Sequence, residues 1–319
     1  MPSRPSPESV LRRVEWTVLR RLDGLLQGDY RTLFRGNGID LADLREYQYG
    51  DDVRHIDWNV TARLQVPHVR EYLEDREVTA WFLLDLSPSV DFGSGQARKR
   101  EIAQDFVALV GRLLTRHGNR VGALLYGSAV EGVIPAGSGR RQVLRILHAM
   151  QQRAAPGARK QAAARRTDLA DLLGAAAQVV RRRSLIFVVS DFFSAPGWAE
   201  RLAHMVRRHE MLAVRLYDPL ESALPDLGLI PFVDSETGEQ VLVDTHDAGF
   251  RERFAEAAER REEGLREGFA RAGADVLELS TEDDLVESIR RFSDLRRRRS
   301  RMPQASRTPE SLPGGRRAA

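Results

Sequence analysis

The chain alternates between apolar runs and amphipathic segments. Residues 77–85 and 184–190 each contain a short, almost continuous apolar run. Runs of this length and composition predict strands that are buried on both faces. Between them, residues 97–117 place apolar side chains on one helical face: Ile102, Phe106, Leu109, Val110 and Leu113. Buried strands that alternate with amphipathic helices predict an α/β fold with a mostly parallel central sheet covered by helices.

The same periodicities predict the remaining elements. Further strands are expected at residues 66–73, 120–126, 211–217 and 274–279, and residues 129–135 return beside 120–126 as a hairpin partner. Helices are expected at 8–29, 138–152, 167–182, 197–209, 247–272 and 282–295, with a polar loop at 153–166. Residues 228–233 and 240–244 flank Asp-Ser-Glu-Thr-Gly-Glu and predict a second hairpin.

Composition limits the class of protein. With 319 residues, 42% of them hydrophobic, the chain can bury a substantial core. Its apolar runs are too short to span a bilayer, and its first residues contain no apolar signal core, so we expect a cytoplasmic protein without a membrane span. The absence of cysteine excludes disulfides and thiolate metal sites.

Charge is distributed unevenly. Residues 295–319 hold eight Arg and one Glu and contribute +7 to a total of +3, so residues 1–294 carry −4. The segment 296–319 is rich in Arg, Pro and Ser without periodicity, and we expect it to be disordered. Such a tail can attract nucleic acid weakly, in a salt-sensitive way, or simply be a solvated tail. We divide the chain into an N-terminal helix and signature segment (1–65), an α/β domain (66–295) and this tail.

Three segments carry oxygen ligands to one edge of the predicted sheet. Asp85, Ser87 and Ser89 follow the first buried strand as Asp-x-Ser-x-Ser, and Asp191 follows the second. Thr167 opens a helix. Because ligands bind beyond the carboxyl ends of parallel strands, these hard oxygen donors predict a Mg²⁺ site, with Mn²⁺ or Ca²⁺ as alternatives. Ordinary roles remain open, since Asp and Ser favour turns and Thr or Asp before a helix can cap it.

This pattern resembles the metal-ion-dependent adhesion site of von Willebrand factor A domains, in which Asp-x-Ser-x-Ser is followed by a Thr and then by an Asp. The resemblance implies that Ser87, Ser89 and Thr167 ligate the metal directly. It implies that Asp85 and Asp191 act directly or through waters, and that one coordination position stays open for a carboxylate of a partner.

A second signature lies upstream. The block Arg45-Glu46-Tyr47…Gly50-Asp51-Asp52-x-Arg54-x-Ile56-Asp57-Trp58…Ala62-Arg63 resembles the bacterial family catalogued as domain of unknown function 58. The resemblance covers residues 30–290 and implies a von Willebrand factor A-like fold. Members often occur beside MoxR-type AAA+ ATPases, which implies that such an ATPase is the partner.

Three interpretations of this block are open. Its alternating Arg and acidic residues would form ion pairs, with Tyr47, Tyr49 and Trp58 packing nearby. Alternatively, Trp, Tyr and Arg form a recognition surface. A third possibility is a second metal or catalytic site, built from Asp51, Asp52, His55 and Asp57.

No catalytic set is evident from the sequence. It contains no phosphate-binding Gly-x-x-x-x-Gly-Lys loop and no Gly-x-Ser-x-Gly elbow. We therefore expect a metal-dependent protein-interaction module and no enzyme, an adaptor of a MoxR-type ATPase in assembly or chaperone-like remodelling. The alternative is a metal-dependent hydrolase of phosphate or peptide substrates that uses Asp85.

Overall fold

The computed structural model describes residues 6–14, 43–48, 51, 53, 56–71, 78–95, 97–153, 167–233 and 240–301. Contacts divide the chain into two compact units. The small unit is residues 35–77, and the large unit is residues 1–34 together with 78–319. The boundary therefore falls between Glu77 and Val78, not after residue 65 as the sequence predicted.

The small unit contains a two-stranded ribbon and a short helix. Strand β1 (Asp43–Glu46) pairs antiparallel with β2 (His68–Glu71), and α4 (Trp58–Leu64) lies between them in sequence. The strand expected at 66–73 is thus present, but its partner is β1 and not a strand of the main sheet. An apolar pattern predicts a strand but does not show which strand it pairs with. The predicted domain boundary was therefore placed before this strand and not after it.

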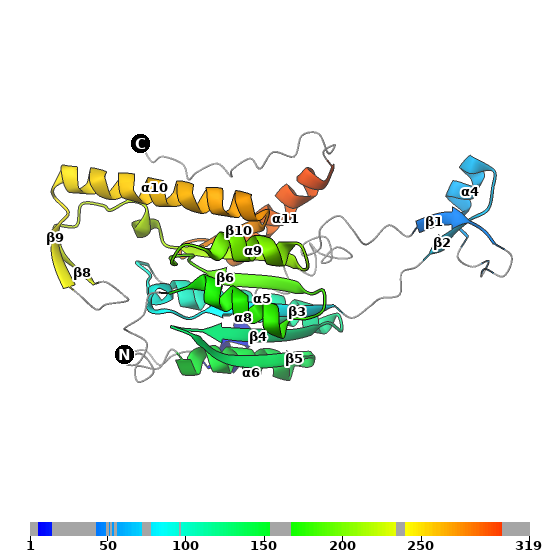
Figure 1. The fold of residues 1–319 in the computed structure, drawn as a ribbon, viewed down its shortest axis with the longest axis horizontal. Helices are drawn as coiled ribbons and strands as arrows, with labels where there is room; N and C mark the ends of the chain where they lie inside the picture. The colour runs from blue at the N-terminus through cyan, green and yellow to red at the C-terminus, as the bar shows by residue number, and fades with distance from the viewer. Residues whose placement is uncertain are drawn as a thin grey trace. The chain divides into compact units, whose positions relative to one another are not determined.

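The large unit is built on a six-stranded sheet with the order β10-β7-β6-β3-β4-β5 (Figure 1). Its strands are β3 (Thr79–Asp85), β4 (Arg120–Tyr126), β5 (Val130–Gly137), β6 (Leu185–Ser190), β7 (Glu210–Tyr217) and β10 (Asp275–Ser280). All neighbours pair in parallel except β5, which returns antiparallel to β4 as the sequence predicted. The expected α/β fold with a mostly parallel sheet is confirmed.

Helices cover both faces of the sheet. They are α1 (Pro7–Val14), α5 (Lys99–Arg116), α6 (Gly139–Arg153), α8 (Leu169–Val179), α9 (Trp198–Val206), α10 (Ala248–Ala272) and α11 (Leu285–Arg301). Successive residues of β3 point to opposite faces: Phe82 and Leu84 join a core with α5 and α6, whereas Trp81 and Leu83 join a core with α8, α9 and α10. This double burial explains the continuous apolar runs of β3 and β6.

Two connections at the carboxyl edge are short 3-10 turns, η3 (Pro88–Asp91) after β3 and η4 (Pro219–Glu221) after β7. The second hairpin, β8 (Leu229–Val233) with β9 (Gln240–Asp244), follows η4 as expected. The first helix is present at Pro7–Val14, and the rest of its predicted range lies outside the described residues, as do most of the 153–166 loop and residues 302–319.

Helix α11 corrects the predicted start of the tail. It continues to Arg301, beyond the expected end at residue 295. The Arg296 side chain lies 3.2 Å from the Asp275 carboxylate on β10, and Arg is a good helix former. The Arg run therefore begins as ordered helix, which its composition alone did not indicate.

Candidate metal-binding site

Asp85 is the last residue of β3, and its side chain is buried. The Ser87 backbone N–H donates to Asp85 Oδ1 at 2.9 Å, and the Ser190 hydroxyl donates to Oδ2 at 2.6 Å. The first bond closes a tight turn after the strand, and the second joins the ends of the neighbouring strands β3 and β6. The sequence pattern placed Asp85 and Asp191 at one edge, and the structure adds Ser190 as the connecting side chain.

The two serines of the motif lie in the turn that follows. Ser87 and Ser89 are both buried, and their Oγ atoms are 3.1 Å apart. Arg100, on α5, holds this turn in place. Its guanidinium donates to the Leu86 carbonyl at 2.9 Å and pairs with Asp91 at 2.8 Å. The hydroxyl pair is therefore positioned by contacts outside the motif itself.

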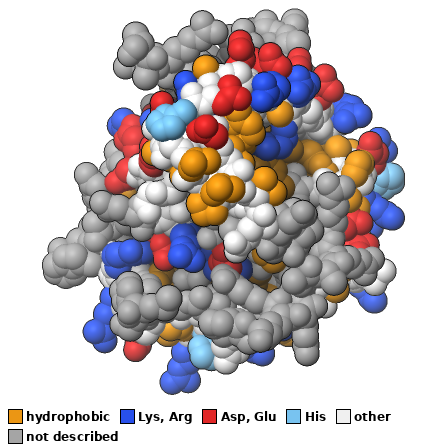
Figure 2. Space-filling model, turned by 90° about the vertical axis from the view of Figure 1, so that its left-hand side faces the viewer, with side chains coloured by type: hydrophobic (Ala, Val, Ile, Leu, Met, Phe, Trp, Pro, Cys, Tyr) orange, Lys and Arg blue, Asp and Glu red, His pale blue; other side chains and the backbone are white. Residues whose placement is uncertain are grey.

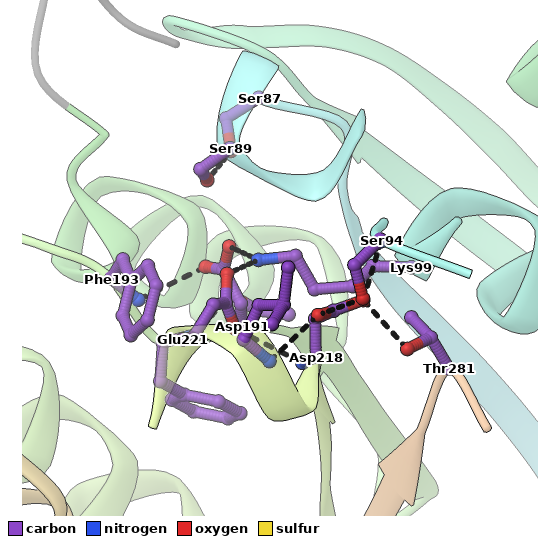
Figure 3. Close-up of polar contacts among 12 residues, drawn as sticks. Ser87, Ser89, Ser94, Lys99, Asp191, Phe193, Asp218, Glu221 and Thr281 are labelled. Carbon is purple, nitrogen blue, oxygen red and sulfur yellow. Dashed lines mark hydrogen bonds and ion pairs between the residues drawn. The ribbon is translucent and has the colours of Figure 1, made fainter. Parts of the chain in front are cut away.

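Asp191 lies at the end of β6, and both of its carboxylate oxygens accept hydrogen bonds. The Phe193 N–H donates to Oδ1 at 3.0 Å, and Lys99 Nζ donates to Oδ2 at 2.7 Å. Lys99 is fully buried and also donates to Glu221 of η4 at 2.6 Å (Figure 3). An internal ammonium thus bridges the ends of β6 and β7 beside the candidate site.

Thr167 is buried on the segment that leads into α8. Its carbonyl accepts from Ala195 N–H at 3.0 Å, in the loop after β6, and the next residue donates its N–H to the Tyr126 hydroxyl at 3.2 Å, at the end of β4. The helix cap is Asp168, whose carboxylate accepts from Ala170 N–H at 2.9 Å. Capping therefore does not account for Thr167, and its backbone is fixed between the ends of β4 and β6.

Burial and mutual repulsion shift the acidity of this cluster. Burial, and next the charge of Asp191, raise the pKa of Asp85 from 3.8 to about 6, although hydrogen bonds from Ser190 and Ser87 oppose the rise. Burial opposes the charged form of Lys99, but Asp191 and Glu221 outweigh that effect and raise its pKa. Burial also raises the pKa of Glu221, against the opposing charge of Lys99. Negative charge at this edge is thus incompletely compensated by the protein.

The donor set fits a hard divalent cation. Adjacent ligands of an octahedral Mg²⁺ at about 2.1 Å lie about 3 Å apart, which matches the separation of the two serine hydroxyls, 3.1 Å. A divalent cation would also offset the repulsion between Asp85 and Asp191. Because both oxygens of each aspartate accept hydrogen bonds, a water-mediated role suits these carboxylates better than direct ligation. Within the described ranges no three Asp, Glu or His side chains gather as a metal cluster; the proposed set contains only two carboxylates.

The sequence did not predict the roles of Lys99, Ser190 and Glu221. Lys99 is one of only two lysines in a chain with 49 basic residues, and that rarity was a usable signal. Ser190 directly precedes Asp191, but a strand-ending serine is common. Glu221 is brought to the site only by the packing of β7 beside β6.

The upstream block is partly described. Asp57 caps α4, accepting from the N–H groups of Asn59 at 3.0 Å and Val60 at 3.2 Å, and Asp51 accepts from Gln48 N–H at 2.8 Å. These are structural roles, while Asp52 and His55 lie outside the described residues. Trp58 is 69% exposed, so the expectation that it packs within the block is wrong. Exposed tryptophan favours the interpretation as a recognition surface.

The profile of a family described as "Protein of unknown function DUF58" matches residues 43–264. The chain belongs to this family. A similar protein is the uncharacterized protein Rv1480 of Mycobacterium tuberculosis (strain ATCC 25618 / H37Rv). It is 38% identical to this chain over 297 residues, which are 92% of this chain and 91% of Rv1480. The signature block thus identified the DUF58 family correctly from the sequence.

Solved structures resemble this DUF58 chain more loosely. An aerotolerance-related membrane protein from Bacteroides fragilis aligns with 13% identity over 69% of this chain and 99% of its own, with a TM-score of 0.44. The SpRpn10 VWA domain aligns with 13% identity over 67% of this chain and 93% of its own, with a TM-score of 0.36. In the described part of the DUF58 chain, no helix is both long and apolar enough to cross a bilayer.

Proposed function

We propose that this DUF58 protein is a metal-dependent protein-interaction module. The residues that we assign to the site are Asp85, Ser87 and Ser89 after β3, Asp191 after β6, and Thr167 before α8. When bound there, Mg²⁺, or Mn²⁺ or Ca²⁺ in its place, would offer an open coordination position to a carboxylate of the partner. The chain itself orients the serine hydroxyls through the η3 turn and fixes both carboxylates by hydrogen bonds.

One observation carries the proposal: two buried carboxylates that repel each other lie at the end of adjacent strands, beside a pair of serine hydroxyls spaced 3.1 Å apart. Burying negative charge that is only partly compensated is costly, so a cluster of this kind favours a cation. The hydrolase alternative lacks comparable support, because both oxygens of Asp85 already accept hydrogen bonds from Ser87 and Ser190.

The partner that we propose is a MoxR-type AAA+ ATPase, acting in protein assembly or chaperone-like remodelling. Support for this choice comes from the family resemblance, since members often occur beside such ATPases. An acidic side chain on the ATPase or on its client would complete the metal shell. The turn that carries Ser87 and Ser89 leads to Phe92, which is 41% exposed, so this edge borders solvent where a partner can approach.

The test is capture of a purified MoxR-type AAA+ ATPase by the purified chain in Mg²⁺ and in EDTA. We expect capture in Mg²⁺ that is lost in EDTA and in Ser87→Ala/Ser89→Ala. The matched control is Ser184→Ala, a buried serine just before the opposite end of β6, whose hydroxyl bonds the Arg182 carbonyl at 2.8 Å. Equal capture by the two variants, or capture that is indifferent to EDTA, would contradict the proposal.

A further inference from the structure

Lys99 occupies a position that disfavours positive charge, beside the candidate metal site. It is the first residue of α5, where the helix dipole disfavours positive charge, and its side chain is 0% exposed. Its Nζ lies 2.7 Å from Asp191, 2.6 Å from Glu221 and 5.0 Å from the ring centroid of Phe193. Lysine is almost never fully buried unless paired, and here two carboxylates and an aromatic face pair it.

We infer that Lys99 is a tethered cation, which supplies in the metal-free protein part of the positive charge that a divalent ion brings when bound. The inference rests on the proposed function, since it concerns the same site. Lys99 holds Asp191, one of the five proposed metal-site residues, and therefore competes with the metal for that carboxylate. It is a positioning residue that sets metal affinity.

The surrounding charges support this assignment. Asp91 is paired with Arg100, and Asp218 is held by the Ser94 and Thr281 hydroxyls at 2.6 and 2.7 Å. Among the described side chains that contact Asp191 or Glu221, Lys99 is the one whose ammonium bonds both carboxylates. Glu221 in turn sets how much of that charge remains for Asp191. Lys99 and Glu221 should consequently affect metal binding in opposite directions.

The experiment compares Lys99→Met with Glu221→Gln in the full chain, stripped of metal by a chelator. Calorimetric titration with MnCl₂ and MgCl₂ gives the metal affinity, and thermal unfolding with and without metal gives the stabilisation. We expect Lys99→Met to bind the ion about tenfold more tightly than the unmodified chain and to gain more thermal stability from it. We expect Glu221→Gln to bind more weakly, because Lys99 then interacts with Asp191 alone.

A merely structural Lys99 would give a different pattern. Both variants would then lose stability, and neither would gain metal affinity, which would overturn the inference. If Lys99→Met fails to fold, Lys99→Met/Glu221→Gln is compared with Glu221→Gln, because the two proteins differ only in the ammonium. The inference then predicts tighter metal binding by the double variant, and equal or weaker binding would overturn it; near-ultraviolet circular dichroism checks the fold.

The outcomes also separate this inference from the proposed function. Binding by Lys99→Met without binding by the unmodified chain would support the tethered cation and reject metal dependence of the native protein. Binding by the unmodified chain with equal or weaker binding by Lys99→Met would reject the tethered cation alone. Binding by neither would reject both.

Discussion

Asp85 shows how a candidate ligand residue can be costly for the fold. Its carboxylate is buried, faces the charge of Asp191, and has a pKa raised to about 6. The hydrogen bonds from Ser87 and Ser190 fix its orientation but do not remove the cost of ionising it. A residue that is selected for stability alone would be neutral at this position, so the charge itself points to ligand binding.

This cost predicts a pH dependence of stability in the metal-free protein. The folded pKa lies above the unfolded value of 3.8, so the folded state binds more protons between about pH 4 and pH 6. Stability should therefore fall as the pH rises through this window, by on the order of 3 kcal/mol at most. Asp85→Asn should lack this fall and be more stable than the unmodified chain at pH 7.5.

Urea unfolding in EDTA at pH 4.5 and pH 7.5 measures both free energies of unfolding. The measurement at pH 4.5 is the control, because Asp85 is then largely protonated. The free energies of unfolding of Asp85→Asn and the unmodified chain should differ least at that pH. If the advantage of Asp85→Asn is the same at both pH values, ionisation of Asp85 is not its cause.

The sequence predicts a candidate ligand set but not the side chains that surround it. Asp85, Ser87, Ser89 and Asp191 follow buried apolar runs, and the runs are recognisable because both faces of β3 and β6 are covered. Lys99 and Glu221 are 122 positions apart and meet only through the order of the strands. Ion pairs of this kind are a property of packing, which no spacing in the sequence encodes.

Among the elements, α10 shows most clearly what the sequence pattern predicts and what depends on tertiary packing. Its apolar period and its capping residues, Asp247 and Gly273, mark its two ends, so the predicted range agreed with the structure. What the pattern did not reveal is how closely α9 approaches. A Cβ atom at Gly268 would lie 2.8 Å from the Trp198 ring, whereas one at Gly264, a turn earlier, would meet nothing within 4 Å.

These two glycines provide a matched pair of substitutions. Gly264→Ala should stabilise the protein by about 0.5–1 kcal/mol, because alanine favours the helix. Gly268→Ala should destabilise it by about 1–3 kcal/mol, because the new methyl group pushes Trp198 out of its contacts with Phe192 and Phe269. Urea unfolding followed by tryptophan fluorescence measures both. Stabilisation of both variants would show that helix propensity outweighs this packing, and destabilisation of both would show that the predicted gain at Gly264 is wrong.

At the scale of the whole molecule, each unit carries a candidate recognition feature. The large unit holds the candidate metal site in a buried edge. The small unit exposes apolar side chains around α4: Val53 is 60% exposed, Trp58 69% and Leu64 57%. The region that matches the family profile includes this helix, so the exposed Trp58 lies within the family match.

Trp58→Ala tests whether this exposed surface takes part in binding. Because Trp58 buries little surface in its own unit, its removal should change the free energy of unfolding by less than about 0.5 kcal/mol. If the surface binds the proposed ATPase, the same change should weaken binding by about 2 kcal/mol, since tryptophan is enriched at the centres of interfaces. Calorimetric titration against the ATPase in Mg²⁺ measures the affinity, with Asn59→Ala, an exposed polar neighbour on α4, as the control. Unchanged affinity in Trp58→Ala would confine the interface to the large unit, and equal losses in both variants would point to damage to α4 instead of a lost contact.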